Sequence, residues 1–168
     1  NAALVGPLPW PRYLVLSDGL LTLLDPAEIR SVVAHEIAHS RARHPALLLV
    51  VFVLLPLLLV SPVLALGAAG METRSLIVAG AVALLAAVAL LRGWSHRFEY
   101  EADQMATESL GGAAAGMQAL QRVGRAVSLN KHRSSLRHPS ERDRIEHLSR
   151  CASDQRFRTA FFLRGRRL

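Results

Sequence analysis

Two histidines and a glutamate stand close together early in the chain, in the segment His35-Glu36-Ile37-Ala38-His39. On an α-helix, residues four positions apart lie on one face, so His35 and His39 can hold one metal ion together. Glu36 lies beside that face and can reach a water molecule on the metal. This set of side chains suits catalytic zinc, which keeps one coordination position open for water. The motif indicates metal-assisted hydrolysis, and the alternative is a solvated helix face with two ordinary histidines.

The residues upstream of the motif predict the helix that this chemistry requires. Asp25 fits an N-cap, Pro26 the first helical position, and Glu28 the acidic residue of a capping box. Apolar residues then recur at helical spacing as far as Ile37. We expect the helix to end near His44, because a proline follows that residue and disfavours helix before it.

The composition limits the class of protein. The chain has 168 residues, enough for one domain, and it begins with asparagine, so we expect it to be a piece of a longer chain. Hydrophobic residues make up 51% and aromatic residues only 5%, a bias that favours membrane helices. The net charge of +7 is carried mainly by arginines in the C-terminal third and beside the apolar runs, which suits an anionic membrane surface at least as well as nucleic acid. The single cysteine, Cys151, excludes an internal disulfide and a cysteine-rich zinc site.

Two long uncharged runs follow the motif helix. Residues 46–70 contain no charged side chain, and as a helix they would extend about 37 Å, more than the roughly 30 Å of a hydrocarbon core. After a short polar turn, residues 76–91 form a second uncharged run of about 24 Å. We predict a hairpin of transmembrane helices over 46–70 and 76–92, and the alternative is a buried hairpin of a soluble domain. Pro56 and Pro62 should kink the first helix, which membrane helices tolerate.

Such a hairpin returns the chain to the side of the membrane that it left, so the segments before and after it share one compartment. Four arginines flank the hairpin on that side: Arg41, Arg43, Arg92 and Arg97. The distal turn carries only one acid and one base. The positive-inside bias therefore predicts that the motif helix faces the cytoplasm. We expect an integral membrane protein, in the bacterial inner membrane.

The remaining segments predict a mainly α-helical domain with a small N-terminal β-element. Short apolar runs at 2–5 and 13–16 favour strands, and 20–24 favours a short buried helix. Three further helical segments are expected, at 95–113 (ending at a Gly-Gly pair), at 113–128 and from Ser140 onward. The arginine-rich tail at 156–168, with its interleaved phenylalanines, is typical of a segment that lies on anionic lipid, or of a frayed terminus.

Two histidines leave a zinc ion short of protein ligands, so a third ligand must come from elsewhere in the chain. Cys151 is one candidate. The acidic segment Glu99-Tyr100-Glu101-Ala102-Asp103 is a better one, because the hairpin brings its helix back to the side of the membrane that holds the motif.

Taken together, these motifs resemble those of the membrane zinc metallopeptidases of the HtpX and CAAX prenyl protease family. The resemblance covers most of the chain, in five segments: Asn1–Gly6, Leu16–Leu21, Ala34–His39, Ser95–Asp103, and His138-Pro139-Ser140 with Arg144-Ile145. It implies a zincin-like metallopeptidase domain in which the transmembrane hairpin is inserted between the HExxH helix and the ExxxD helix. One departure is His96, where the family usually has arginine. His96 and His138 could both approach the metal in this fold.

The resemblance also implies roles for the matching residues. His35, His39 and Glu99 would bind one zinc ion per chain, and Glu36 would act as the general base. Asp103, one helical turn after Glu99, would orient a ligand histidine without touching the metal.

Other polar residues near the motifs have different expectations. His138 is either a turn residue before a proline or a donor to the reaction oxyanion or to a carboxylate, and thus a candidate stabiliser of the transition state. Glu101 points away from the expected ligand position, which favours a surface acid. His44 lies off the ligand face, so we expect a structural or surface role. His132 and His147 are expected to be exposed.

The sequence therefore predicts a zinc-dependent membrane endopeptidase of membrane-protein quality control or processing. Its partners would be peptide or membrane-protein substrates and the lipid bilayer, with no nucleic acid, and no particular oligomeric state is predicted. One alternative is the sensor-type membrane metallopeptidase of an antibiotic receptor, which would also need an extracellular sensor domain. Another is a catalytically silent zinc-binding membrane protein, which the intact motif residues argue against. A basic nucleic-acid module is disfavoured by the uncharged run over 46–70.

Overall fold

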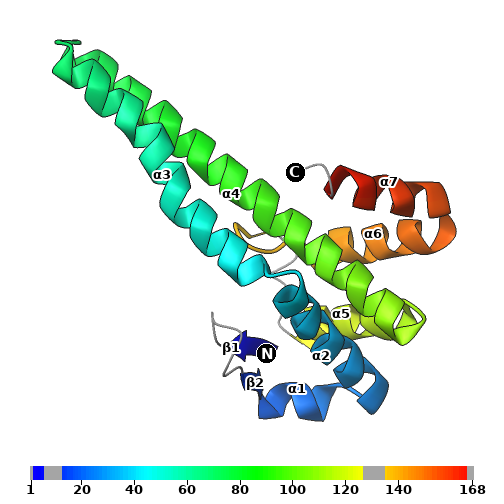
Figure 1. Cartoon of the computed structure of the whole chain (residues 1–168). Coiled ribbons are helices and arrows are strands. Elements are labelled where there is room, and N and C mark those ends of the chain that lie inside the picture. The colour runs from blue at the N-terminus through cyan, green and yellow to red at the C-terminus, as the bar shows by residue number, and fades with distance from the viewer. Residues whose placement is uncertain (1, 6–12, 127–134, 166–168) are drawn as a thin grey trace.

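Two strands and seven helices follow one another in the part of the chain that the computed structural model describes, which is residues 2–5, 13–126 and 135–165 (Figure 1). The predicted mainly α fold with a small N-terminal β-element is confirmed. The expectations for Gly6, for His132, for the loop residues 130–134 and for the last residues of the tail, 166–168, lie outside the described residues.

The strands form a two-stranded ribbon against the motif helix. β1 (Ala2–Val5) pairs antiparallel with β2 (Tyr13–Leu16), with Ala2 opposite Leu16 and Val5 opposite Tyr13. β1 also contacts α2 (Pro26–Arg41). The ribbon therefore places β1 beside the helix that carries the HExxH residues.

Capping groups set the start of α2 where the sequence predicts it. The Asp25 side chain accepts hydrogen bonds from the backbone N–H groups of Ala27 and Glu28, each at 3.0 Å. The Glu28 carboxylate accepts one in return from the Asp25 N–H, also at 3.0 Å, which completes the capping box. Glu28 is fully buried, and its charge is paired with the guanidinium of Arg122 at 3.1 Å.

A sharp turn links α2 to the next helix. α2 ends at Arg41, a little before the predicted end near His44. Arg43 then takes a left-handed backbone conformation, with φ of 57°, which L-residues other than glycine adopt rarely. α3 (His44–Ala68) begins directly after this turn, so the turn fixes how His44 faces the end of α2.

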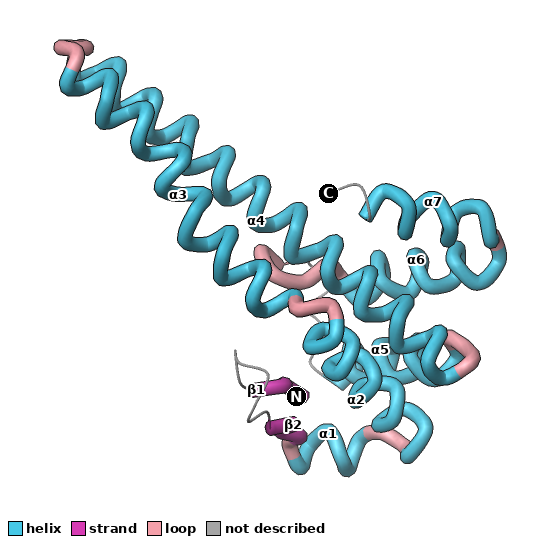
Figure 2. The backbone as a smooth tube through the Cα atoms, in the orientation of Figure 1, coloured by secondary structure: helices cyan, strands magenta, loops and turns pink. Residues whose placement is uncertain are grey.

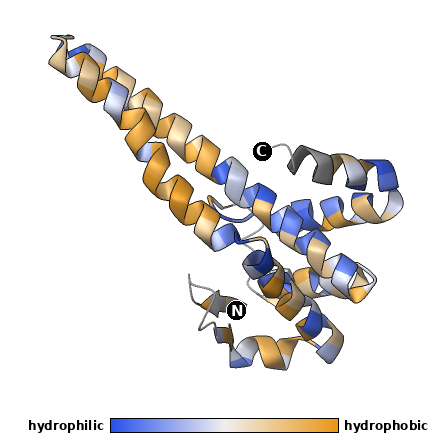
Figure 3. Cartoon of the chain, viewed as in Figure 1, coloured by the Kyte–Doolittle hydropathy of each residue, from blue (hydrophilic) through white to orange (hydrophobic). Residues whose placement is uncertain are grey.

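α3 and α4 (Thr73–Leu110) form a long antiparallel hairpin that projects away from the rest of the chain (Figure 2). Both are long and apolar enough to cross a membrane. Among the described residues, none of the most apolar 18-residue stretch of α3 is buried, and only 6% of that of α4. Figure 3 shows that the projecting part is mostly hydrophobic while the base is mixed with polar residues. The segments predicted separately at 76–92 and 95–113 are one continuous helix.

A small apolar core lies at the base of the hairpin. Leu20, in α1 (Asp18–Leu23), packs with Leu24 and with Ala119 of α5 (Ala114–Ala126). Partly buried apolar residues surround this cluster: Ala2, Leu16, Leu23, Ile29, Val32 and Val123. α5 also packs on α2, so the motif helix contacts both α4 and α5.

The C-terminal helices close the other side of α4. α4 ends at the predicted Gly-Gly pair, where Gly111 has φ of 73° and only glycine fits without strain. α6 (Glu141–Ser153) packs on α4, and α7 (Gln155–Gly165) packs on α6. The tail is therefore helical over 155–165 rather than frayed.

His147 corrects one expectation, because its ring is half-buried rather than exposed. Its centroid lies 4.6 Å from that of Tyr100 and 4.8 Å from that of Phe161. The aromatic rings of α4 and α7 thus enclose it between them. Cys151 is also buried, with its Sγ 3.4 Å from His147 Nε2, and it does not belong to the cluster of metal-ligand groups described below.

Candidate metal centre

Two helices from distant parts of the chain bring three potential metal ligands together. His35 and His39 lie on α2 and Glu99 on α4, and one ligand atom from each lies within 4.8 Å of the others. The Nε2 atoms of the histidines are 3.1 Å apart, and the Glu99 carboxylate lies 3.6 Å from His35 Nε2 and 3.4 Å from His39 Nε2. Within the described residues this is the one cluster of three such donors, and it could hold a metal ion.

Small side chains allow the two helices to approach this closely. Ala38 of α2 and Ala102 and Ala106 of α4 are all buried, Ala102 completely. Larger residues at these positions would separate the helices and move Glu99 away from the histidines. The close packing of α2 on α4 therefore sets the geometry of the cluster.

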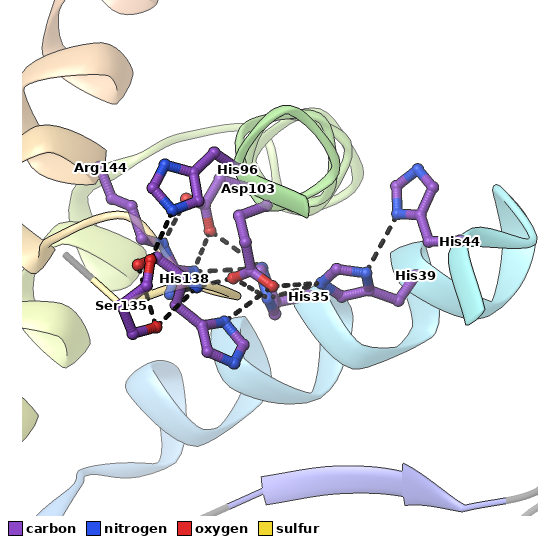
Figure 4. Close-up of polar contacts among 9 residues, drawn as sticks. His35, His39, His44, His96, Asp103, Ser135, His138 and Arg144 are labelled. Carbon is purple, nitrogen blue, oxygen red and sulfur yellow. Dashed lines mark hydrogen bonds and ion pairs between the residues drawn. The ribbon is translucent and has the colours of Figure 1, made fainter. Parts of the chain in front are cut away.

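Asp103 lies behind His35, on the side away from the cluster. His35 Nδ1 is 2.9 Å from Asp103 Oδ1, so the ring donates there and turns Nε2 towards Glu99 (Figure 4). Arg144 of α6 fixes Asp103 in turn, because its Nε donates to Asp103 Oδ2 at 2.8 Å. The same guanidinium lies 3.4 Å from Glu99 Oε2 and so touches both carboxylates. In the sequence, Arg144 was noted only as part of the Arg144-Ile145 segment of the resemblance, and its contacts with the two carboxylates were not predicted.

His44 lies behind His39 in a similar way, so of the two expected roles, structural or surface, its burial excludes the surface role. Its Nδ1 is 3.0 Å from His39 Nδ1 (Figure 4), and the residue is only 2% exposed. The expectation for Glu101 is corrected: its carboxylate is half-buried and lies 3.6 Å from His44 Nε2. In the sequence, His44 follows His39 by five residues, and on a continuous helix its side chain would point away from His39. It faces His39 because α2 ends at Arg41.

Charges in the cluster shift the pKa values of its groups far from their ordinary values. Burial alone would lower the pKa of His35, but hydrogen bonds to Asp103 and Glu99 outweigh it and raise that pKa to about 9. Burial would raise the pKa of Glu99, yet the three surrounding histidines and Arg144 hold it well below its usual range. For Asp103, the charge of Arg144 overcomes burial and lowers the pKa to about 2. The low pKa values of Glu99 and Asp103 keep both carboxylates ionised, and negative charge at the cluster favours a bound cation.

A loop after the undescribed residues 127–134 brings His138 to the cluster. His138 Nδ1 lies 3.0 Å from Glu99 Oε1, and its side chain is 56% exposed. Of the two expectations for this residue, the contact favours a donor to a carboxylate. Two groups of α4 hold the loop: Arg92 Nη1 and His96 Nε2 both contact the Ser135 carbonyl oxygen, at 2.8 Å and 2.9 Å. His96 therefore reaches the loop and not the metal cluster (Figure 4), and no sequence signal pointed to this.

A cavity of about 470 Å³ opens beside the cluster. Glu36 lines it together with His35, His39 and Glu99. Residues of β1 form one part of its wall, and Pro45 and Leu48 at the start of α3 form another. The cavity therefore extends from the ribbon to the foot of the hairpin, with the cluster between them.

Comparison with known proteins agrees with this arrangement. Residues 1–152 match the sequence profile described as Peptidase family M48. A protein named Protease HtpX homolog, from Pyrobaculum calidifontis, is 32% identical over 130 residues, which cover 72% of this chain and 36% of that protein. The chain therefore corresponds to little more than a third of that relative. No solved structure matches the chain. On the extent of the family match, the chain belongs to peptidase family M48, and it is similar to a protease HtpX homolog.

Proposed function

We propose that the chain is a zinc-dependent membrane endopeptidase, with zinc held by His35, His39 and Glu99. The main observation in support is the convergence of these three donors from α2 and α4 within 4.8 Å. Two imidazoles and one carboxylate are a ligand set of catalytic zinc sites, which leave a position for water.

The chemistry of the donors supports zinc in a second way. Each histidine has an acceptor behind its Nδ1 atom, Asp103 for His35 and His44 for His39. A neutral imidazole that carries its proton on Nδ1 has a free electron pair on Nε2. Both Nε2 atoms face the Glu99 carboxylate, which suits one shared cation.

The reaction follows from what the residues around the cation can do. Bound zinc would supply Lewis acidity, which acidifies water and polarises a peptide carbonyl. Glu36, beside the cluster in the cavity, accepts a proton from the attacking water and passes it to the leaving amine. His138 reaches the cluster from an exposed loop and can donate a hydrogen bond to the developing oxyanion.

β1 is suited to hold a substrate in an extended form. Among the described residues it pairs with one strand only, β2, and Ala2 and Ala3 line the cavity. A peptide that adds to the free edge of β1 would lie across the mouth of the cavity beside Glu36. N-methylation of a single substrate amide that faces β1 should then weaken cleavage, whereas N-methylation of the neighbouring amide, which faces away, should not.

The exposed apolar hairpin supports a location in the membrane. We propose transmembrane segments over 46–70 and 76–92, in a bacterial inner membrane, with the cluster on the cytoplasmic side. The name of the relative, a protease HtpX homolog, supports a role in proteolysis. We propose peptides or membrane proteins as its substrates, in quality control or processing.

The proposal is tested by cleavage of a generic unfolded protein in detergent, with and without a chelator. We expect chelation to stop cleavage and zinc to restore it. Glu36→Gln should retain zinc, measured by elemental analysis, but lose cleavage, whereas His35→Ala or His39→Ala should lose the metal. Undiminished turnover by Glu36→Gln would reject the assignment of the general base.

A further inference from the structure

We propose that His44, backed by Glu101, positions the metal ligand His39, as Asp103 positions His35. The inference rests on the proposed zinc site. It adds two residues that are neither ligands nor the general base of that site. It treats His44 and Glu101 as positioning residues, because neither reaches the space between the three ligands.

The first support is how the chain delivers His44. The turn through Arg43, with its left-handed backbone, reverses the chain between α2 and α3 and brings the His44 ring back against the end of α2. The ring is 2% exposed, and its Nδ1 lies 3.0 Å from the Nδ1 of His39. A ring buried this deeply needs partners for its nitrogen atoms, and His39 supplies one of them.

The second support is that only one arrangement of protons satisfies all three residues. Zinc requires a free electron pair on His39 Nε2, so the proton of that ring sits on Nδ1. His39 Nδ1–H then donates to His44 Nδ1, which must be unprotonated, and the proton of His44 lies on Nε2. That atom faces the Glu101 carboxylate at 3.6 Å. Each proton donor thus faces an acceptor, from His39 through His44 to the Glu101 carboxylate.

The third support is packing that holds the His44 ring in place. Phe98 of α4 stacks on it with ring centroids 4.3 Å apart and an angle of only 9° between the planes. Phe98 immediately precedes the ligand Glu99, and Glu101 follows two residues later, so one turn of α4 supplies both the ligand and the support for the opposite histidine. Helix α4 therefore supplies one ligand, Glu99, and supports another, His39 of α2.

Glu101 cannot take the place that Asp103 has. Asp103 reaches the Nδ1 of its ligand histidine directly, at 2.9 Å, whereas Glu101 contacts His44 and His44 in turn contacts His39. The alternative to the proposal is that His44 is only a buried core residue. The two readings differ in what happens when its size is kept and its nitrogen atoms are removed.

The test is zinc affinity, measured by chelator competition on the purified full chain in detergent. His44→Phe keeps a ring that can stack on Phe98 but cannot accept from His39. His44→Asn removes the ring and places an acceptor oxygen close to the position of Nδ1. Glu101→Gln keeps the size of the side chain and removes its charge, and Glu108→Gln, an exposed acid on the same helix, is its matched control. Visible absorption of the Co²⁺-substituted protein reports the ligand geometry without any activity assay.

We expect His44→Phe to weaken zinc binding by about 10- to 100-fold, as removal of such supporting groups does, and to change the Co²⁺ spectrum. His44→Asn should recover most of the affinity, Glu101→Gln should lose about threefold, and Glu108→Gln should lose nothing. A folded His44→Phe variant with the affinity and spectrum of the parent would overturn the inference. If thermal unfolding shows that His44→Phe does not fold, unchanged affinity in Glu101→Gln would overturn it instead.

His39→Ala separates this inference from the proposed function. If the parent binds zinc and His39→Ala does not, the proposed site stands, and the His44 variants alone decide the inference. If the parent binds neither zinc nor Co²⁺, the proposed zinc site fails, and the inference fails with it.

Discussion

The two halves of helix α4 differ in the side chains that they expose and bury: the first exposes large apolar residues, and the second buries charged and polar ones. Over 76–91 the helix is uncharged, and large apolar residues such as Ile77 and Leu85 are each 68% exposed. Beyond residue 95 the buried side chains include Glu99, Asp103 and Gln104, each at most 6% exposed. In water, both arrangements would be unfavourable, because apolar side chains would be exposed and charged side chains would be buried. The contrast is explained if the first half is solvated by lipid and the second by its own protein partners.

The second half shows what a buried charge requires. Glu99 has three histidines and an arginine around it, and Asp103 has His35 and Arg144. Such groups are stable in an interior only when they are paired, and loss of one partner leaves the other uncompensated. Because one continuous helix carries both halves, the proposed insertion of the hairpin into a membrane would be coupled directly to the position of Glu99.

The largest expected effect comes from removing the charge at the centre of the buried half. Glu99→Gln keeps the shape of the side chain but takes away a metal ligand, so we expect the loss of zinc and a fall of cleavage to background. Elemental analysis and the cleavage assay measure the two effects. Glu108→Gln, exposed on the same helix, should leave both unchanged. A Glu99→Gln variant that holds one zinc ion and cleaves normally would remove α4 from the site.

A charge in the middle of the exposed half should have the next largest effect. Leu84, 65% exposed, lies near the centre of the apolar run, so Leu84→Arg should disfavour membrane insertion by about 3 kcal/mol. Leu84→Ile is the matched control and should insert normally. Extraction of membranes with alkaline carbonate distinguishes inserted from peripheral protein. If Leu84→Arg inserts as well as the parent, then water and not lipid surrounds this part of the hairpin.

A smaller effect is expected where the buried half meets the loop that carries His138. His96→Ala removes one of the two donors to the Ser135 carbonyl and should cost about 1 kcal/mol, roughly a fivefold fall in kcat. If the loop acts on cleavage only by positioning His138, KM should stay nearly constant. His96→Arg, which brings in the residue usual in the family, should restore kcat. A change in KM alone would indicate that the loop contacts substrate instead.

The smallest predicted change concerns Gln104, in the buried half of α4. Gln104 is 1% exposed, and neither atom of its side-chain amide has a hydrogen-bond partner among the described residues. Gln104→Met should therefore stabilise the protein by about 1 kcal/mol, because the cost of burying the amide disappears. Thermal unfolding in detergent measures this gain. A loss of stability would mean that the amide is satisfied, for example by an internal water molecule.

Local sequence signals predicted the parts of the fold that depend on neighbouring residues. The capping box at Asp25 and Glu28 set the start of α2, and Gly111 set the end of α4. The sequence also indicated His35, His39 and Glu99, because HExxH spacing and the return of the hairpin are both readable without a structure. The structure brings all three together.

What the sequence did not predict depends on contacts between distant segments. The segments 76–92 and 95–113 were predicted separately, but α4 continues from one into the other, since the glycine between them costs only about 1 kcal/mol and packing on α3 outweighs it. His44 was judged from helical spacing, yet the turn at Arg43 redirects it towards His39. Glu101 acquires its partner only through that redirected ring.

X-ray absorption at the zinc edge tests the central claim most directly, because it reports which atoms surround the metal in the full chain. We predict one zinc ion per chain, with nitrogen and oxygen neighbours at about 2.0–2.2 Å and the scattering pattern of two imidazoles. In Glu99→Gln, any zinc that remains should show a changed shell. Sulfur neighbours, a single imidazole, or a shell that does not respond to Glu99→Gln would contradict the joining of α2 and α4 around one cation.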